Sequence, residues 1–230
     1  MGSGGSKGLV QDDGFGMFCG VFDHSDIEAC GAWLQAETIV QSRAGARHLM
    51  QYAAVRQFAG DPRLLSIARR FLGADPIPFR ATLFDKSARR NWLVAWHQDT
   101  ALPLRRRVDV TGWGPWSMKG GVTYAHAPAA ALSHVVALRV HIDDSGSDNG
   151  PLRVLPGTHL RGVLSDAQLE GAVRHIPPVE CIAPAGGVVA MRPLVVHASS
   201  KADSDCPRRV LHVEYADDVF MGGGLELALA

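Results

Sequence analysis

The sequence predicts an α+β protein that is mainly β, with helices in the first third of the chain and an antiparallel β-rich part after them. Two observations predict this class. Apolar residues recur at helical spacing up to about residue 75, and from Ile77 onward short alternating runs are separated by Gly, Pro, Asp and Ser. The chain has 230 residues, of which 47% are hydrophobic, enough for one well-packed core. We therefore expect a sandwich or barrel with helices covering one outer face.

Three helices are expected before residue 75. Ser25 and Glu28 fit a capping box, followed by an apolar stripe formed by Ile27, Cys30, Trp33 and Leu34. Residues 46–58 form a second candidate helix. A third is better delimited, because Asp61 can cap it, Pro62 suits its first turn and Gly73 can end it. Its core face comprises Leu64, Leu65, Ala68, Phe71 and Leu72.

Seven runs after residue 76 are expected to form strands, and residues 165–173 a short helix among them. The expected strands are Ile77–Phe84, Trp92–Asp99, Val135–Ile142, Leu152–Leu155, Val179–Ala183, Gly187–Met191 and Arg209–Tyr215. We expect residues 1–9 to be a disordered start or a cloning scar. Residues 10–230 are then a single domain whose helical part extends to about residue 75.

Composition excludes several function classes. Lys and Arg number 23 and Asp and Glu also 23, so no charge excess favours nucleic acid or an anionic membrane. No apolar run is long enough for a transmembrane helix, and the first residues lack the apolar core of a signal peptide. The four cysteines form no C-x-x-C pair. We expect a cytoplasmic protein in a reducing environment that acts on a small molecule; its oligomeric state is not predicted.

His97 and Asp99 are the leading candidates for a metal site. They end a strand-like run, and residues two apart in a strand face the same way. An imidazole and a carboxylate from one segment suit a divalent transition metal, with His197, at the end of another apolar run, as a third ligand. Two histidines and one carboxylate leave open coordination positions, which is the arrangement of non-haem iron(II) oxygenases.

Spacing alone does not single out this pair. His141 and Asp143 have the same separation, and His212 and Glu214 nearly the same chemistry. The alternative interpretation of His141 is a strand histidine before a turn that begins at Asp143. The surrounding segments are needed to separate the candidates.

Those segments resemble the phytanoyl-CoA dioxygenase family of 2-oxoglutarate-dependent oxygenases over about residues 10 to 216. Asp13-Gly14-Phe15 and the helix after it resemble the usual start of that family. Trp96-His97-Gln98-Asp99 resembles its iron motif, and residues 143–159, with Asn149-Gly150-Pro151, resemble its strand–turn block. His197-Ala198-Ser199 followed by Arg208 resembles its distal-histidine segment. In that family the strand–turn block follows the first two metal ligands, so His141 and Asp143 fall outside the metal site.

The resemblance implies a double-stranded β-helix, a cupin-like jelly-roll barrel, with N-terminal helices packed on its major sheet. It implies Fe(II) held by His97, Asp99 and His197, with 2-oxoglutarate and O2 as cosubstrates. Arg208, eleven residues after the distal histidine, would pair with the far carboxylate of 2-oxoglutarate, supported by Ser199. Lys86, on a strand leading to the iron motif, is a further candidate for binding 2-oxoglutarate or substrate. Because Asp99 is present, hydroxylation is favoured over halogenation.

Strand alternation favours Arg208 over Arg209 as the anchor. Arg209, Leu211, Val213 and Tyr215 form one mostly apolar face, which suits packing under helices. Arg208, Val210, His212 and Glu214 form the other, more polar face, which suits the lumen of a barrel. A buried arginine matches a carboxylate through two parallel hydrogen bonds.

The function predicted is an Fe(II)- and 2-oxoglutarate-dependent oxygenase that hydroxylates or otherwise oxidises an unactivated C–H bond of a small molecule, releasing succinate and CO2. Two alternatives are a cupin-like isomerase, lyase or 2-oxoglutarate-independent dioxygenase, and a non-catalytic binding protein on the same scaffold. The arginine run 105–107 and the loop 113–119, which has two tryptophans, are candidates for substrate contacts or for plain surface. His126, His134, His159 and His175 are expected to be structural or exposed.

Overall fold

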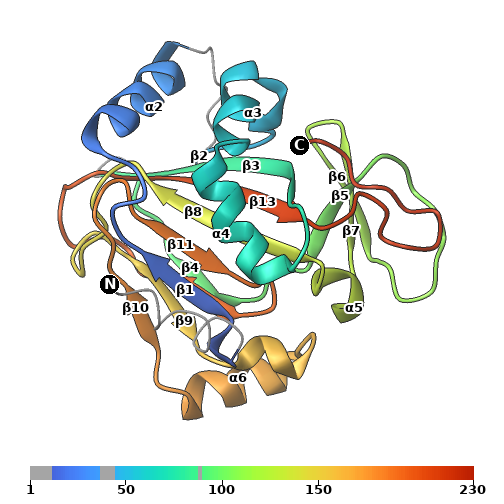
Figure 1. The fold of residues 1–230 in the computed structure, drawn as a ribbon. Helices are drawn as coiled ribbons and strands as arrows, with labels where there is room; N and C mark the ends of the chain where they lie inside the picture. The colour runs from blue at the N-terminus through green and yellow to red at the C-terminus, as the bar shows by residue number, and fades with distance from the viewer. Residues whose placement is uncertain (1–11, 37–44, 88–89) are drawn as a thin grey trace.

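The computed structural model describes residues 12–36, 45–87 and 90–230. The expected disordered start at residues 1–9 lies outside these ranges. Figure 1 shows helices α2, α3 and α4 gathered over one face of the sheets, with a separate group of strands, β5, β6 and β7, at one side. Among the described helices, none combines the length and apolar character that crossing a membrane requires.

Two antiparallel sheets form the main body. The larger has the order β1-β11-β8-β13-β3-β2, and the smaller β10-β9-β12-β4. The strands of the larger sheet are β1 (Phe15–Phe18), β11 (Val188–Met191), β8 (Val135–His141), β13 (Arg208–Ala216), β3 (Ile77–Lys86) and β2 (Gly45–Ala46). Those of the smaller sheet are β10 (Val179–Cys181), β9 (Leu152–Leu155), β12 (Val196–Ser199) and β4 (Val94–His97). All seven predicted strand runs are therefore strands in the structure, with ends shifted by a few residues.

A third, three-stranded sheet was not predicted from the sequence. It has the order β5-β7-β6 and comprises β5 (Ala101–Leu104), β7 (Val122–His126) and β6 (Trp116–Lys119). Residues 113–119 are therefore only partly a loop, because the last four of them are β6. These strands have four or five residues, and β5 is mostly buried while β6 is mostly exposed, so they carry too little alternation to stand out in the sequence.

The helices cover the outer face of the larger sheet. These are α2 (His24–Ala36), α3 (Ala53–Ala59) and α4 (Pro62–Leu72), and the short 3-10 turn η1 (Leu49–Gln51) lies between α2 and α3. The predicted apolar face of β13, Leu211, Val213 and Tyr215, is fully buried in one cluster with residues of these helices. Leu64, Ala68 and Phe71 of α4 are buried in the same cluster, as predicted.

The two main sheets also pack against each other. Phe15, Ala137, Leu152, Val154 and Met191 are among the residues of a second buried cluster between them. Three short helices complete the chain: α5 (Ala129–Leu132), the 3-10 helix η2 (Thr158–Arg161), and α6 (Asp166–His175) near the predicted position 165–173. At α6, Ser165 and Gln168 form a reciprocal capping box.

The beginning of α4 follows the sequence signals closely. The Asp61 carboxylate accepts a hydrogen bond from the backbone N–H of Arg63 at 2.8 Å, Pro62 is the first helical residue, and Gly73 ends the helix at φ 74°. Only glycine adopts this left-handed conformation without a steric penalty, so the stop is local in origin.

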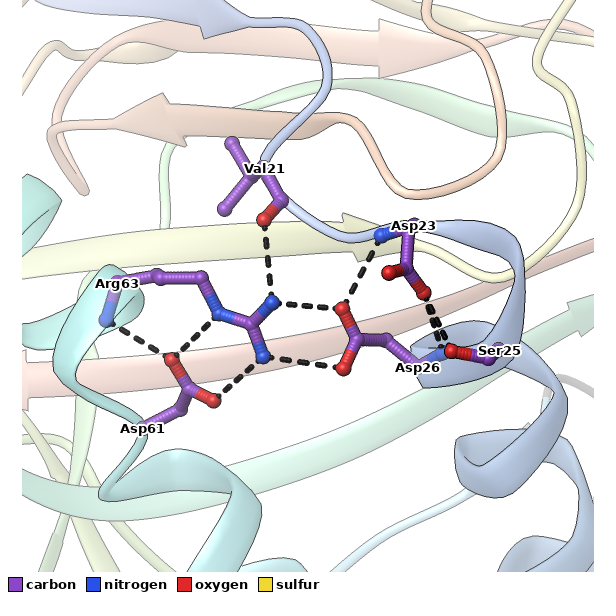
Figure 2. Close-up of polar contacts among 6 residues, drawn as sticks. All are labelled: Val21, Asp23, Ser25, Asp26, Asp61 and Arg63. Carbon is purple, nitrogen blue, oxygen red and sulfur yellow. Dashed lines mark hydrogen bonds and ion pairs between the residues drawn. The ribbon is translucent and has the colours of Figure 1, made fainter.

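The cap of α2 differs from the prediction. Asp23, not Ser25, accepts the hydrogen bond from the N–H of Asp26, and the Asp26 carboxylate accepts one from the N–H of Asp23 (Figure 2). Ser25 instead donates its hydroxyl to Asp23. Arg63 then bridges Asp26 and Asp61, so the beginnings of α2 and α4 are tied together. A carboxylate accepts more strongly than a hydroxyl, which explains why Asp23 displaces Ser25.

The predicted helix over residues 46–58 is wrong in its first half. Gly45 and Ala46 pair with Phe84 and Leu83 of β3, and the helix α3 begins only at Ala53. Gly45 has φ 128°, and a Cβ there would lie 1.9 Å from the carbonyl oxygen of Leu83. Such a close pairing needs glycine, and it is a non-local contact that helical periodicity does not report. The strand β1 near the N-terminus was missed for the same reason, since it forms by pairing with β11.

Candidate functional site

Three potential metal ligands converge between the sheets. His97 ends β4, Asp99 follows it by two residues, and His197 lies in β12 directly opposite His97 in the strand register. Asp99 Oδ1 lies 3.7 Å from His97 Nε2, and Asp99 Oδ2 lies 3.5 Å from His197 Nε2. One ligand atom from each residue falls within 4.8 Å of the other two. This is the two-histidine, one-carboxylate set predicted from the sequence.

Both histidines are oriented by the same local contact. His97 Nδ1 lies 2.8 Å from the carbonyl oxygen of Ala95, and His197 Nδ1 lies 2.9 Å from that of Val195. A carbonyl can only accept, so each Nδ1 carries the proton and donates it. Each Nε2 is then left with its lone pair directed toward Asp99, which is the tautomer that a metal ligand requires.

The electrostatics prepare the same set of atoms for a cation. Burial lowers the pKa of His197 to about 4, so this imidazole is neutral at neutral pH. Burial acts to raise the pKa of Asp99, but the facing histidines and Arg80 outweigh it and hold that pKa at about 2. An ionised Asp99 carboxylate beside the neutral His197 imidazole is a protonation state that binds Fe(II), so the residues present fit the metal.

A cavity of about 90 Å³ extends from the three ligands into the lumen. Beyond the ligands it is lined by Phe84, Trp92, Val94, Arg139, Leu152, Ala198, Ser199, Arg208 and His212. Two of the residues predicted to bind 2-oxoglutarate, Ser199 and Arg208, line it, and the third, Lys86, is buried next to Ser199. Lys86 Nζ donates to Ser199 Oγ at 2.9 Å, and Arg208 Nη2 donates to the same oxygen at 3.2 Å.

Arg208 is buried and incompletely paired. It is 3% exposed, its Nε donates to the carbonyl oxygen of Asn149, and its Nη1 has no hydrogen-bond partner among the described residues. Arg209 lies on the opposite face of β13 and pairs with Asp143 at 2.7 Å. The alternation argument thus placed Arg208 correctly toward the lumen and Arg209 away from it.

Sequence reasoning missed Arg139 as a lumen residue. It lies on β8 opposite His212 of β13, its Nη1 contacts His212 Nδ1 at 3.2 Å, and its buried Nε has no partner within the described part of the chain. Burial lowers its pKa to about 10, and burial together with Arg208 and Arg139 lowers that of Lys86 to about 8. Three buried cations, of which Arg139 and Arg208 each have a donor without a partner among the described residues, form a site that fits a dianion such as 2-oxoglutarate.

The period-two pattern of β8 contained the signal for Arg139. Within the buried run Val135–His141, only Arg139 and His141 are polar, and they stand two residues apart on one face. His141 is fully buried and neither of its ring nitrogens has a hydrogen-bond partner among the residues described. His141 is not one of the three ligands, which agrees with the expectation from the strand–turn resemblance.

The remaining candidates lie on or near the surface. Arg105 pairs with Glu226, and Arg107 pairs with Asp109, so two of the three arginines in the run have acidic partners outside the cavity. Three of the histidines set aside have partners of their own: His126 with Thr100, His134 with Asp217, and His175 with the carbonyl of Gly171.

A larger hollow of about 760 Å³ lies between α2 and the loop after β8. None of the three ligands lines this hollow. Arg209 and its partner Asp143 form part of its wall. The chemistry of the donor set, rather than the size of the hollow, therefore identifies the functional site.

Comparison with known proteins decides the family. The phytanoyl-CoA dioxygenase (PhyH) family model matches residues 28–210. The chain belongs to the phytanoyl-CoA dioxygenase family. The resemblance noted in the sequence is thereby confirmed.

One curated relative in this comparison is L-proline trans-4-hydroxylase from Streptomyces griseoviridis, 26% identical over 180 residues. The match covers 67% of this chain and 59% of the relative, so the chain spans somewhat more than half the length of that enzyme.

Solved structures show the same fold at low identity. The non-heme alpha ketoglutarate dependent epimerase SnoN from nogalamycin biosynthesis is 19% identical, with a TM-score of 0.68 over 95% of this chain and 85% of that one. EctD from S. alaskensis, solved with 2-oxoglutarate and 5-hydroxyectoine, is 18% identical, with a TM-score of 0.68 over 91% of this chain and 74% of that one. The predicted double-stranded β-helix, with its mostly antiparallel sheets, is confirmed.

Family membership and the site geometry point to one class of chemistry. The intact His-Asp-His set in this member of the family is the ligand arrangement that Fe(II) takes in non-haem iron oxygenases.

Proposed function

We propose that this protein is an Fe(II)- and 2-oxoglutarate-dependent oxygenase that hydroxylates a C–H bond of a small molecule. The observation that carries the proposal is the combination of the three convergent ligands with the buried cationic end of the same cavity. A plain metal-binding cupin needs the ligands but has no use for three buried cations next to them. A non-catalytic binding protein has no need for an intact ligand set.

His97, Asp99 and His197 would hold Fe(II), which when bound supplies the oxidising chemistry that couples decarboxylation of 2-oxoglutarate to oxidation of the substrate. The backbone contacts of the two histidines fix their rings before the metal arrives. Asp99 would fill a coordination position with an oxygen ligand, which favours hydroxylation over halogenation.

Arg208 would bind the far carboxylate of 2-oxoglutarate. Its Nη1 is the free donor, and Ser199 can turn its hydroxyl from the carbonyl oxygen of Gly150 toward the ligand. Lys86 adds a second positive charge from the same direction, since its ammonium already contacts Ser199. A carboxylate held by a guanidinium and a hydroxyl is fixed in both distance and orientation.

Arg139 would stabilise the charge nearer the metal. It is opposite His212 in the strand register, and it lines the same cavity as the three ligands and Arg208. Its free Nε can donate to a carboxylate of the bound cosubstrate. Burial and the Arg139 charge hold the pKa of Arg208 below its ordinary range, and binding of a dianion removes this penalty.

The experiment that tests the proposal has two readouts. Anaerobic addition of 2-oxoglutarate to the Fe(II)-loaded protein should produce a weak visible charge-transfer band, and a suitable substrate should stimulate succinate formation. L-Proline is the first compound to try, because one relative is named for its hydroxylation. Absence of the band, together with tight Zn(II) binding and no effect of 2-oxoglutarate, would contradict the proposal.

A further inference from the structure

A second group of polar side chains lies at the other end of the lumen from Arg208. In the register of β3 and β13, Lys86 is opposite Arg208, and Arg80 is opposite Glu214. These two pairs are six residues apart, which is roughly 20 Å along a strand. His212, which lies on the same face of β13 between Arg208 and Glu214, lines the cavity of the three ligands, so the metal ligands lie between the two ends. One end is suited to 2-oxoglutarate, and the other remains to be explained.

Arg80 connects this second end to the metal segment. Its guanidinium pairs with the buried carboxylate of Glu214, and its Nη1 donates to the carbonyl oxygen of Ala101 at 2.9 Å. Ala101 begins β5, two residues after Asp99. The guanidinium also lies 5.9 Å from the ring centre of Tyr124 in β7. Figure 1 shows β5, β6 and β7 grouped beyond the arrowhead end of β13, which is the Glu214 end.

Tyr124 is the centre of a cluster of donors. It is 4% exposed, and its hydroxyl lies 3.1 Å from His48 Nε2. The ammonium of Lys119 lies 5.1 Å from the centre of the Tyr124 ring. Arg47 directly precedes His48 in the chain, and its charge acts to lower the pKa of both Lys119 and Tyr124. We call Arg47, His48, Arg80, Lys119 and Tyr124 the outer cationic cluster.

The charges of this cluster are not balanced. Glu214 neutralises Arg80, but no ion pair joins Arg47 or Lys119 to an acidic side chain within residues 12–36, 45–87 and 90–230. Burial and the nearby Arg47 and Arg80 lower the pKa of Lys119. Two positive charges beside a buried tyrosine and a histidine fit an anionic group better than a neutral or cationic one.

The backbone of His48 supports a functional reason for the cluster. His48 has φ 59° and ψ 39°, and it is the one non-glycine residue with positive φ in the part of the chain that the structure describes. Strain of this kind is kept where the surroundings hold a side chain in a required place. Here the turn between β6 and β7 closes on the ring, since a Cβ on Gly120 would lie 2.8 Å from His48 Cε1.

We propose that the outer cationic cluster binds an anionic group of the primary substrate, so that the substrate is a small carboxylic acid or a phosphate ester rather than a neutral molecule. This inference rests on the proposed function, because it places the substrate opposite 2-oxoglutarate across the metal. Lys119 and Arg47 would supply charge, while Tyr124 and His48 would supply fixed hydrogen bonds. The substrate would then present to the metal a carbon a short distance from its anionic group.

The test uses a fluorinated probe and fluorine NMR on the full-length protein loaded with Zn(II) and saturating 2-oxoglutarate, which fills the Arg208 end. We expect para-fluorobenzoate to bind about tenfold more tightly than para-fluorobenzamide, as two partly exposed ion pairs predict. Replacing Zn(II) by Mn(II) should broaden the signal of bound benzoate, which places it near the metal. A parallel titration with para-fluorophenyl phosphate shows whether the outer cationic cluster prefers a phosphate or a carboxylate.

The variant Lys119→Met should reduce benzoate affinity by a factor of about three, and adding Arg47→Met should remove the preference over the amide. Lys201→Met, at an exposed lysine after β12, is the matched control and should change nothing. Equal binding of acid and amide, displacement of 2-oxoglutarate by benzoate, or an unchanged preference in the double variant would overturn the inference. The Fe(II) and 2-oxoglutarate band is measured separately, so loss of the band marks failure of the proposed function instead.

Discussion

Replacement of Arg208 by Met tests the assignment of the 2-oxoglutarate end most directly. Methionine keeps the buried volume of the side chain but removes its charge and its donors. A buried charge pair that loses one partner costs about 3–5 kcal/mol. Lys86 and Arg139 remain beside the carboxylate in the variant, so we expect a smaller loss of about 2–3 kcal/mol, or roughly a 30- to 150-fold rise in the Kd of 2-oxoglutarate.

The assay is an anaerobic titration of 2-oxoglutarate into the Fe(II)-loaded protein, followed by the visible band. Stability should move differently from binding. Without ligand, Arg208 is a buried cation that Arg139 repels, so Arg208→Met should leave the free energy of unfolding unchanged or raise it. A variant that binds weakly because it is misfolded would instead have a lowered free energy of unfolding.

Arg209→Met is the matched control. Arg209 pairs with Asp143 away from the lumen, and its side chain is 31% exposed, so its loss should cost at most about 1 kcal/mol of stability and leave the Kd unchanged. If Arg209→Met raises the Kd while Arg208→Met leaves it within about twofold of wild type, the alternation argument for β13 is refuted.

Three further predictions follow from the same structure. His97→Ala and Asp99→Ala should each abolish the band while the protein stays folded by circular dichroism, and a variant that retained the band would remove that residue from the ligand set. Burial and the neighbouring arginines lower the pKa of Lys86 to about 8, so 2-oxoglutarate affinity should be full below that pH and fall as the pH rises through it. This pH dependence should vanish in Lys86→Met. A pH profile of the variant identical to that of wild type would contradict the assignment to Lys86. Tyr215→Phe should cost about 1–2 kcal/mol in urea unfolding, because the buried hydroxyl donates to the carbonyl oxygen of Ala59 at 2.9 Å; a loss below about 0.5 kcal/mol would show that the bond contributes little to stability.

The sequence by itself determined features whose causes are local. Asp61, Pro62 and Gly73 define α4 because capping, a fixed proline φ and a left-handed stop act within one turn. His97 and Asp99 were placed on one side because they stand two residues apart at the end of a strand. The same alternation chose Arg208 over Arg209. The ordered resemblance of three segments then gave the family, which the family match confirms.

Tertiary structure alone decided which distant residues meet. His197 lies opposite His97 because β12 pairs with β4, and no local pattern fixes that register. Arg139 reaches the lumen because β8 lies beside β13 in the larger sheet, and the outer cationic cluster exists because a strained His48 meets the β6–β7 turn. Periodicity reports which face a side chain occupies, whereas the partner across that face is set by how the sheets close on each other. The metal ligands and Arg208 could therefore be named from the sequence, while Arg139 and the outer cationic cluster required the fold.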